Sequence, residues 1–264
     1  MSDSDSFMSH LVELKVRLTR SIIALLVVFG ALFYWARDIY SVLAEPMLAK
    51  LPPGTQMIAV EVASPFFVPI KVTMFAALII ALPYILYQIW AFVAPGLYSH
   101  EKKFVLPLIA TSTLLFVVGM AFAYFIVFPV VFKFITQFAP EGVAVMTDIQ
   151  KYFDFVLALF LAFGVAFETP IAVVLLTRMG IVSIEQLKQA RPYVVVGAFV
   201  VAAIFTPPDV VSQLLLAFPL WLLYETGIII SGWMGKAAGD DDAKAEKAKV
   251  EDKTGQGGSD TPAR

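Results

Sequence analysis

The residue of this sequence best placed for chemistry is Glu168, a carboxylic acid inside a long apolar stretch. The residues from Phe155 to Phe167 carry no charge, and neither do those from Thr169 to Thr177. At about 1.5 Å of rise per residue, Glu168 would lie about 15 Å along a helix from Arg178 and about 21 Å from Asp154, near the middle of a hydrocarbon core of about 30 Å. An ionisable group at that depth costs free energy, so it usually faces a bundle interior or a wet cavity and marks a functional site.

A structural role for Glu168 is the alternative to a functional one. Its carboxyl could share a hydrogen bond with a neighbouring helix, with Gln213 or Thr169 as the partner. Pro170 lacks a backbone N–H and clashes with the preceding turn, so we expect the helix to kink beside the acid. We take Glu168 and Gln213 as the candidate intramembrane polar site.

Two further acids, Glu13 and Glu101, lie at the ends of apolar segments. Glu13 belongs to an amphipathic stretch, residues 9–18, that leads into the first apolar segment. Glu101 lies in the tight loop after the second segment. Each has a plain alternative, because Glu13 can pair with Arg17 at the i,i+4 spacing and Glu101 can be a solvated loop charge beside Lys102.

Enzyme and metal chemistry lack their usual residues. The chain has no cysteine and two histidines, which excludes disulfides and thiolate nucleophiles and is too few for a helix-borne zinc site. It has no nucleophile elbow, glycine-rich phosphate loop or His-Glu-x-x-His motif. An intramembrane aspartyl protease would need two deep carboxylates, and only Glu168 is deep. We therefore expect no catalytic residue, no metal and no cofactor.

The elements that must position these acids are membrane-spanning helices. Hydrophobic residues make up 59% of the 264-residue chain, charged residues make up 15%, and the mean hydropathy is +0.82. These values are typical of an integral membrane protein. We expect an all-α fold with six transmembrane helices, over Ser21–Ala36, Val72–Val93, Phe104–Phe132, Phe155–Leu176, Tyr193–Phe205 and Val211–Ile230.

The last two helices are predicted to be short. The run from Tyr193 to Phe205 would give roughly 20 Å of helix, less than a bilayer core. The sixth segment is interrupted by Pro219 and Glu225. Asp209, in the turn between the two helices, either caps the sixth helix or has a functional role.

The first loop after a transmembrane segment is rich in proline. We expect residues 38–45 to form a short helix on the outer membrane surface, ended by Pro46.

The charges predict the topology and the domain boundaries. An even number of helices puts both termini on one side, and lysine and arginine concentrate there, at Lys15, Arg17, Arg20, Lys102, Lys103, Arg178, Lys188, Arg191 and Lys236. By the positive-inside rule, both termini are cytoplasmic. We divide the chain into an N-terminal cytoplasmic amphipathic segment (1–20), a six-helix transmembrane domain (21–235) and a charged, disordered cytoplasmic tail (236–264).

Several short motifs follow one another along the chain between about residues 7 and 233. They are His10-Leu11-x-Glu13-Leu14, Val62-Ala63-Ser64-Pro65-Phe66-Phe67, Tyr87-Gln88-x-Trp90-Ala91-Phe92, Pro95-Gly96-Leu97-Tyr98-x-His100-Glu101, Phe163-Gly164-x-x-Phe167-Glu168-x-Pro170, Arg191-Pro192-Tyr193 and Thr206-Pro207-Pro208-Asp209. Together they resemble the TatC family, the polytopic subunit of the twin-arginine protein translocase. Lys15 departs from the pattern of many relatives, which have arginine there.

The resemblance implies a concave, glove-like bundle that receives twin-arginine signal peptides of folded cargo. It implies that Glu13 and Glu101 hold the arginine pair, with Phe92 and Leu97 nearby. A guanidinium matches a carboxylate with two parallel hydrogen bonds that an ammonium cannot copy, so such a site would prefer Arg-Arg to Lys-Lys. The resemblance also implies that Glu168 is the polar group of the concave face. It marks two outer positions as functionally sensitive, Pro46 and Asp209.

The partners are likewise implied by the resemblance. They are TatA- and TatB-type single-span proteins, further copies of this chain and the bilayer of the bacterial cytoplasmic membrane, with the proton gradient as the energy source and no nucleic acid. The alternative is a proton- or ion-coupled small-molecule transporter that uses Glu168 as carrier. That alternative predicts solute flux without a partner protein and little effect of changing Glu13 or Glu101. A membrane-protein insertase would be expected to present a basic residue to its groove, where this chain presents an acid.

Overall fold

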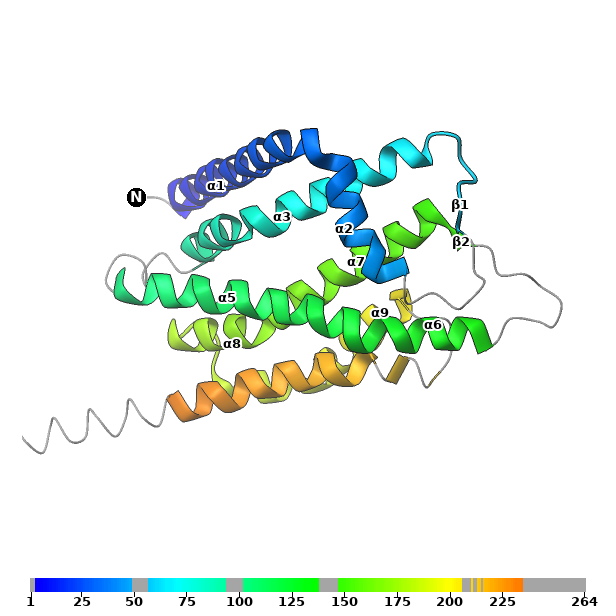
Figure 1. Cartoon of the computed structure of the whole chain (residues 1–264). Helices are drawn as coiled ribbons and strands as arrows, with labels where there is room; N and C mark the ends of the chain where they lie inside the picture. The colour runs from blue at the N-terminus through cyan, green and yellow to red at the C-terminus, as the bar shows by residue number, and fades with distance from the viewer. Residues whose placement is uncertain are drawn as a thin grey trace, which may run out of the picture.

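The fold is built from long helices that run back and forth across one bundle (Figure 1). The computed structural model describes residues 3–48, 57–93, 102–137, 147–205, 210, 213, 214 and 216–234. The elements are α1 (Asp3–Leu32), a 3-10 turn η1 (Phe33–Trp35), α2 (Ala36–Leu48), β1 (Met57–Ile58), α3 (Ser64–Val93), α5 (Lys102–Phe122), a π-helical turn η2 (Ala123–Val127), α6 (Phe128–Gln137), β2 (Thr147–Asp148), α7 (Ile149–Phe167), α8 (Thr169–Arg178), α9 (Ile184–Phe205) and a final helix, Leu216–Met234.

Six helical stretches of the described residues are long and apolar enough to cross a membrane, which confirms the predicted number. They are Met8–Glu45, Ser64–Val93, Val105–Phe132, Ile149–Arg178, Ile184–Phe205 and Leu216–Met234. The last two are the shortest, at 22 and 19 residues. Each is close to the roughly 20 residues that a bilayer requires.

The fifth spanning helix is longer than its apolar run. It begins at Ile184 instead of Tyr193, because a capping box starts it upstream: the Ser183 amide donates to Gln186 Oε1 at 2.8 Å, and the Gln186 amide donates to Ser183 Oγ at 3.2 Å. The polar turns that follow end at Arg191, whose Nη2 donates to Glu225 Oε2 at 2.8 Å. Glu225 therefore does not break the final helix, since a cation of the neighbouring helix neutralises it.

The expected end of the outer helix at Pro46 is wrong. The α2 backbone continues to Leu48, so the helix includes Pro46 although this residue has no N–H to donate. Figure 1 shows α2 crossing α3 towards α7. Ala44 is buried in the same core cluster as Val68 of α3 and Phe153 of α7, so α2 packs into the bundle.

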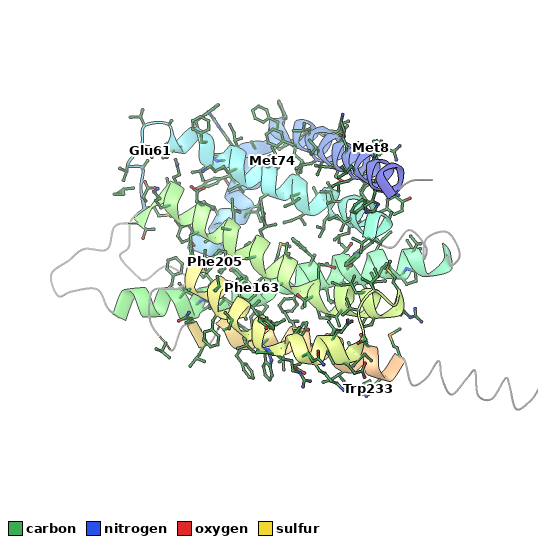
Figure 2. The ribbon with its side chains drawn as sticks, turned by 180° about the vertical axis from the view of Figure 1, so that it is seen from behind. Met8, Glu61, Met74, Phe163, Phe205 and Trp233 are labelled. Carbon is green, nitrogen blue, oxygen red and sulfur yellow. The ribbon has the colours of Figure 1, made fainter. Side chains whose placement is uncertain are left out.

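The two ends of the bundle differ. The start of α1, the end of α3, the start of α5 and the end of α8 gather at one end, which we call the N-terminal side (Figure 1). Figure 2 shows Met8 and Trp233 at this side and Glu61 at the other. The opposite end, the strand side, holds the parallel pair β1–β2 and the Asp148 carboxylate, which accepts from the amides of Val60 at 3.0 Å and Lys151 at 2.9 Å.

Candidate functional site

Glu13 lies on α1 where this helix packs beside α3 near the N-terminal side. Arg17, one turn later, donates from Nε and Nη2 to Glu13 Oε1 at 2.9 and 2.7 Å. Its Nη1 also lies 3.4 Å from Oε1 of Gln88 on α3. The side chains of Arg17 and Glu13 are 21% and 36% exposed, so the carboxylate is the more accessible partner. The i,i+4 pair that the spacing allowed is therefore present.

Two aromatic rings lie beside this ion pair. His10, one turn before Glu13 on α1, stacks on Phe92 of α3 with ring centroids 4.4 Å apart and an interplanar angle of 22°. Gln88 lies one turn before Phe92 on α3, so α1 and α3 each supply polar and aromatic side chains to one place. We call these five residues, His10, Glu13, Arg17, Gln88 and Phe92, the rim site. Glu101 and Leu97, also expected here, lie outside the described residues.

The second candidate site is a chain of hydrogen bonds inside the bundle. Trp90 Nε1 of α3 donates to Ser112 Oγ of α5 at 2.8 Å, and that hydroxyl donates to Glu168 Oε2 at 2.7 Å. Glu168 Oε1 is buried and has no hydrogen-bond partner among the described residues. We call Trp90, Ser112 and Glu168 the interior site. It links three helices through one hydroxyl group.

Glu168 occupies a break between two helices, as predicted. The fourth spanning segment is divided into α7, which ends at Phe167, and α8, which begins at Thr169 with Pro170 in its first turn. The Glu168 amide donates to the Val165 carbonyl at 3.1 Å, and its carbonyl accepts from Ala172 at 2.9 Å. The acid thus sits at the joint between the two helices.

Gln213, which we expected beside Glu168, belongs to a different contact. Its Nε2 donates to the Phe199 carbonyl of α9 at 3.2 Å. Gln213 precedes the final helix, which starts near the strand side, whereas Glu168 lies about 15 Å along the helix from Arg178 at the other side. The side chain of Pro46 and all of Asp209 lie outside the described residues.

Sequence reasoning missed Ser112, the residue that Glu168 contacts. A signal was present, since Thr111-Ser112-Thr113 places three hydroxyls in an otherwise apolar segment. Thr113 donates to the Ile109 carbonyl of its own helix at 2.8 Å, whereas the Ser112 hydroxyl bonds to other helices. Polar residues that bridge helices are common in membrane bundles, so these three hydroxyls indicate a contact with a neighbouring helix.

Comparison with known proteins identifies the family. The family described as "Sec-independent protein translocase protein (TatC)" matches residues 9–219. This chain belongs to the TatC family. A TatC protein of Azotobacter chroococcum is 56% identical over 229 residues, covering 86% of this chain and 90% of that protein. The TatC protein of Escherichia coli K12 is 55% identical over 231 residues, covering 88% of this chain and 90% of that protein.

Solved structures agree with the family assignment. A crystal structure described as the "Twin Arginine Translocase Receptor- TatC" superimposes with a TM-score of 0.74 at 43% sequence identity, covering 85% of this chain and 98% of that one. The chain is thus a multi-pass membrane protein and a protein translocase component, not an enzyme. The predicted family and the predicted six-helix fold are confirmed.

Proposed function

We propose that this chain is the receptor subunit of a twin-arginine translocase, and that Glu13 and Glu101 bind the arginine pair of signal peptides carried by folded cargo. One observation carries the proposal: Glu13, an accessible carboxylate, already binds a guanidinium with two donors on one oxygen. A site that binds the guanidinium of Arg17 has the charge and the acceptor geometry for a signal arginine. Phe92, whose ring stacks on His10 one turn before Glu13, would supply an apolar surface for the residues that flank the arginine.

The N-terminal side would then face the cytoplasm. Basic residues of the described chain concentrate towards this side, at Lys15, Arg17, Arg20, Lys102, Lys103, Arg178, Lys188 and Arg191. Fewer lie towards the strand side, at Arg37, Lys71, Lys133 and Lys151. Of these, Lys71 is neutralised by Asp154 at 2.6 Å. The bias follows the positive-inside rule for a protein with cytoplasmic termini in a bacterial inner membrane. In that orientation the rim site would face the compartment in which cargo is made and folded.

The interior site would serve the apolar part of the signal or a partner helix. Glu168 keeps one buried oxygen without a partner among the described residues, so it can accept a hydrogen bond from an arriving segment. The partners we propose are single-span proteins of the TatA and TatB type and further copies of this chain. We propose the proton gradient as the energy source for export. Pro46 and Asp209 are proposed as functional positions of the opposite face.

A small-molecule transporter with Glu168 as carrier is the competing function. Family membership favours the translocase, because the matched family is one of protein translocase proteins. The two functions also differ in which acid they need. A transporter needs Glu168 and tolerates changes at position 13, whereas a signal receptor needs Glu13.

The direct test is binding of a fluorescent twin-arginine peptide to the purified protein in lipid nanodiscs. We expect Glu13→Gln and Glu101→Gln each to weaken binding by about 1.5 to 3 kcal/mol, the worth of a hydrogen bond to a charged group, which raises Kd about tenfold to hundredfold. Glu185→Gln is the matched control, because it removes an exposed carboxylate near the same side of the bundle. Unchanged affinity in both Glu13→Gln and Glu101→Gln would falsify the receptor site.

A further inference from the structure

The proposed function leaves Arg17 of the rim site without a role of its own. It is not a solvated surface charge, since Nε and Nη2 both donate to Glu13 Oε1 and its side chain is 21% exposed. We propose that Arg17 is an internal competitor for the arginine ligand: its guanidinium occupies Glu13 in the free protein, and a signal arginine must displace it. This inference rests on the proposed function, because it takes Glu13 as the arginine-binding carboxylate.

Arg17 and a signal arginine cannot share Glu13 without a cost. Arg17 uses Oε1, and no donor among the described residues bonds to Oε2. A second guanidinium on Oε2 would bring two positive charges to one negative charge at hydrogen-bonding distance, where they repel each other. The ligand therefore either displaces Arg17 or binds against its repulsion. In both cases Arg17 lowers the apparent affinity of Glu13 for cationic ligands.

Gln88 offers the displaced guanidinium a second acceptor. Its side chain is buried at 3% exposure, and its Oε1 already lies 3.4 Å from Arg17 Nη1. Arg17 can turn from Glu13 towards this amide oxygen and keep a polar partner. Glu13, the more exposed member of the pair, is then open from outside. The exchange is a side-chain rearrangement within the rim site and requires no movement of α1 or α3.

Competition of this kind sets a minimum affinity that a ligand must have in order to occupy Glu13. If only the fraction of protein with Arg17 turned away can bind, the dissociation constant of every ligand of Glu13 rises by the same factor. The ratio between a twin-arginine and a twin-lysine peptide stays constant. The twin-lysine peptide binds more weakly because it cannot form the forked contact, so the same factor raises its Kd above the concentrations at which it would occupy the site. Arg17 would thus prevent weak cationic segments from occupying the receptor.

The test measures Kd for both peptides on the full-length chain in nanodiscs. We expect Arg17→Gln to lower both values by the same factor, about two- to tenfold, as for the loss of a partly exposed ion pair. Arg17→Lys keeps the charge and loses the two-donor contact of the guanidinium, so it should lower Kd by a smaller factor than Arg17→Gln does. Arg20→Gln is the matched control: it removes the same charge three residues along α1, from an exposed side chain that forms no hydrogen bond or ion pair with the described residues of the rim site.

The double variant Glu13→Gln/Arg17→Gln separates this inference from the receptor site itself. It should bind no more tightly than Glu13→Gln, because Arg17 competes only where Glu13 is charged. An equal gain in Arg20→Gln, or no gain in Arg17→Gln while Glu13→Gln weakens binding, overturns the competitor role and leaves the receptor function standing. Wild-type affinity in Glu13→Gln and Glu101→Gln overturns the receptor function, and with it the role of Arg17.

Discussion

Glu13 and Glu168 are both glutamates, and their surroundings give them different chemistry. Glu13 is partly exposed and binds a cation, whereas Glu168 lies between helices and accepts from a neutral hydroxyl. The Glu13–Arg17 pair was predictable because the i,i+4 spacing requires only that the segment be helical. The contact with Ser112 was not, because it depends on how α5 and α7 are staggered along each other. Local spacing does not contain that information.

The hydroxyl of Ser112 holds the interior site together. Ser112→Ala leaves Trp90 Nε1 and Glu168 Oε2 without this partner inside the bundle, so we expect a loss of about 1 to 3 kcal/mol in stability, measured as a lower thermal unfolding midpoint in mild detergent. Thr113→Ala is the control, since its hydroxyl donates to the carbonyl of Ile109 in the same helix and to no other described residue. Equal midpoints for the two variants would mean that the bridge contributes nothing.

At the scale of elements, proline is an unreliable guide to helix ends in this chain. Pro170 coincides with the break between α7 and α8, as expected. By contrast, Pro83 and Pro107 lie inside helices, and α2 continues beyond Pro46. Packed neighbours in a membrane bundle can compensate for the missing donor, so a proline ends a helix only where other interactions also favour the break. The number and order of helices were predictable from apolar length, whereas their exact bounds were not.

The packing of α5 against α7 depends on glycine. A Cβ at Gly119 would lie 2.5 Å from the Phe163 carbonyl oxygen and 3.0 Å from Phe167 Cβ. Because that oxygen belongs to the backbone of α7, the helices would have to separate. We therefore expect Gly119→Ala to destabilise the protein by about 1 to 3 kcal/mol, seen as a lower unfolding midpoint and less monodisperse protein after extraction. Gly197→Ala, with nothing within 4 Å of the added Cβ, should show neither effect.

On the scale of the whole molecule, α3 connects the two candidate sites. Gln88 contacts Arg17 of α1, while Trp90, two residues later, donates to Ser112 of α5. Residues two apart on a helix point to roughly opposite faces, so the last turns of α3 contribute a side chain to the rim site and another to the interior site. The motif that contains both residues was visible in the sequence. That one residue faces α1 and the other α5 became clear only from the packing.

The orientation of the molecule decides whether the rim site can meet cargo, and the absence of cysteine makes it measurable. Val62→Cys, at a fully exposed position on the strand side, should react with a membrane-impermeant maleimide added to intact spheroplasts. Ile181→Cys, at an exposed position in the loop after α8, should react only after the membrane is opened. We expect this result because basic residues concentrate towards the N-terminal side. The opposite labelling pattern would put Glu13 outside the cell, where no newly made signal peptide could reach it before export.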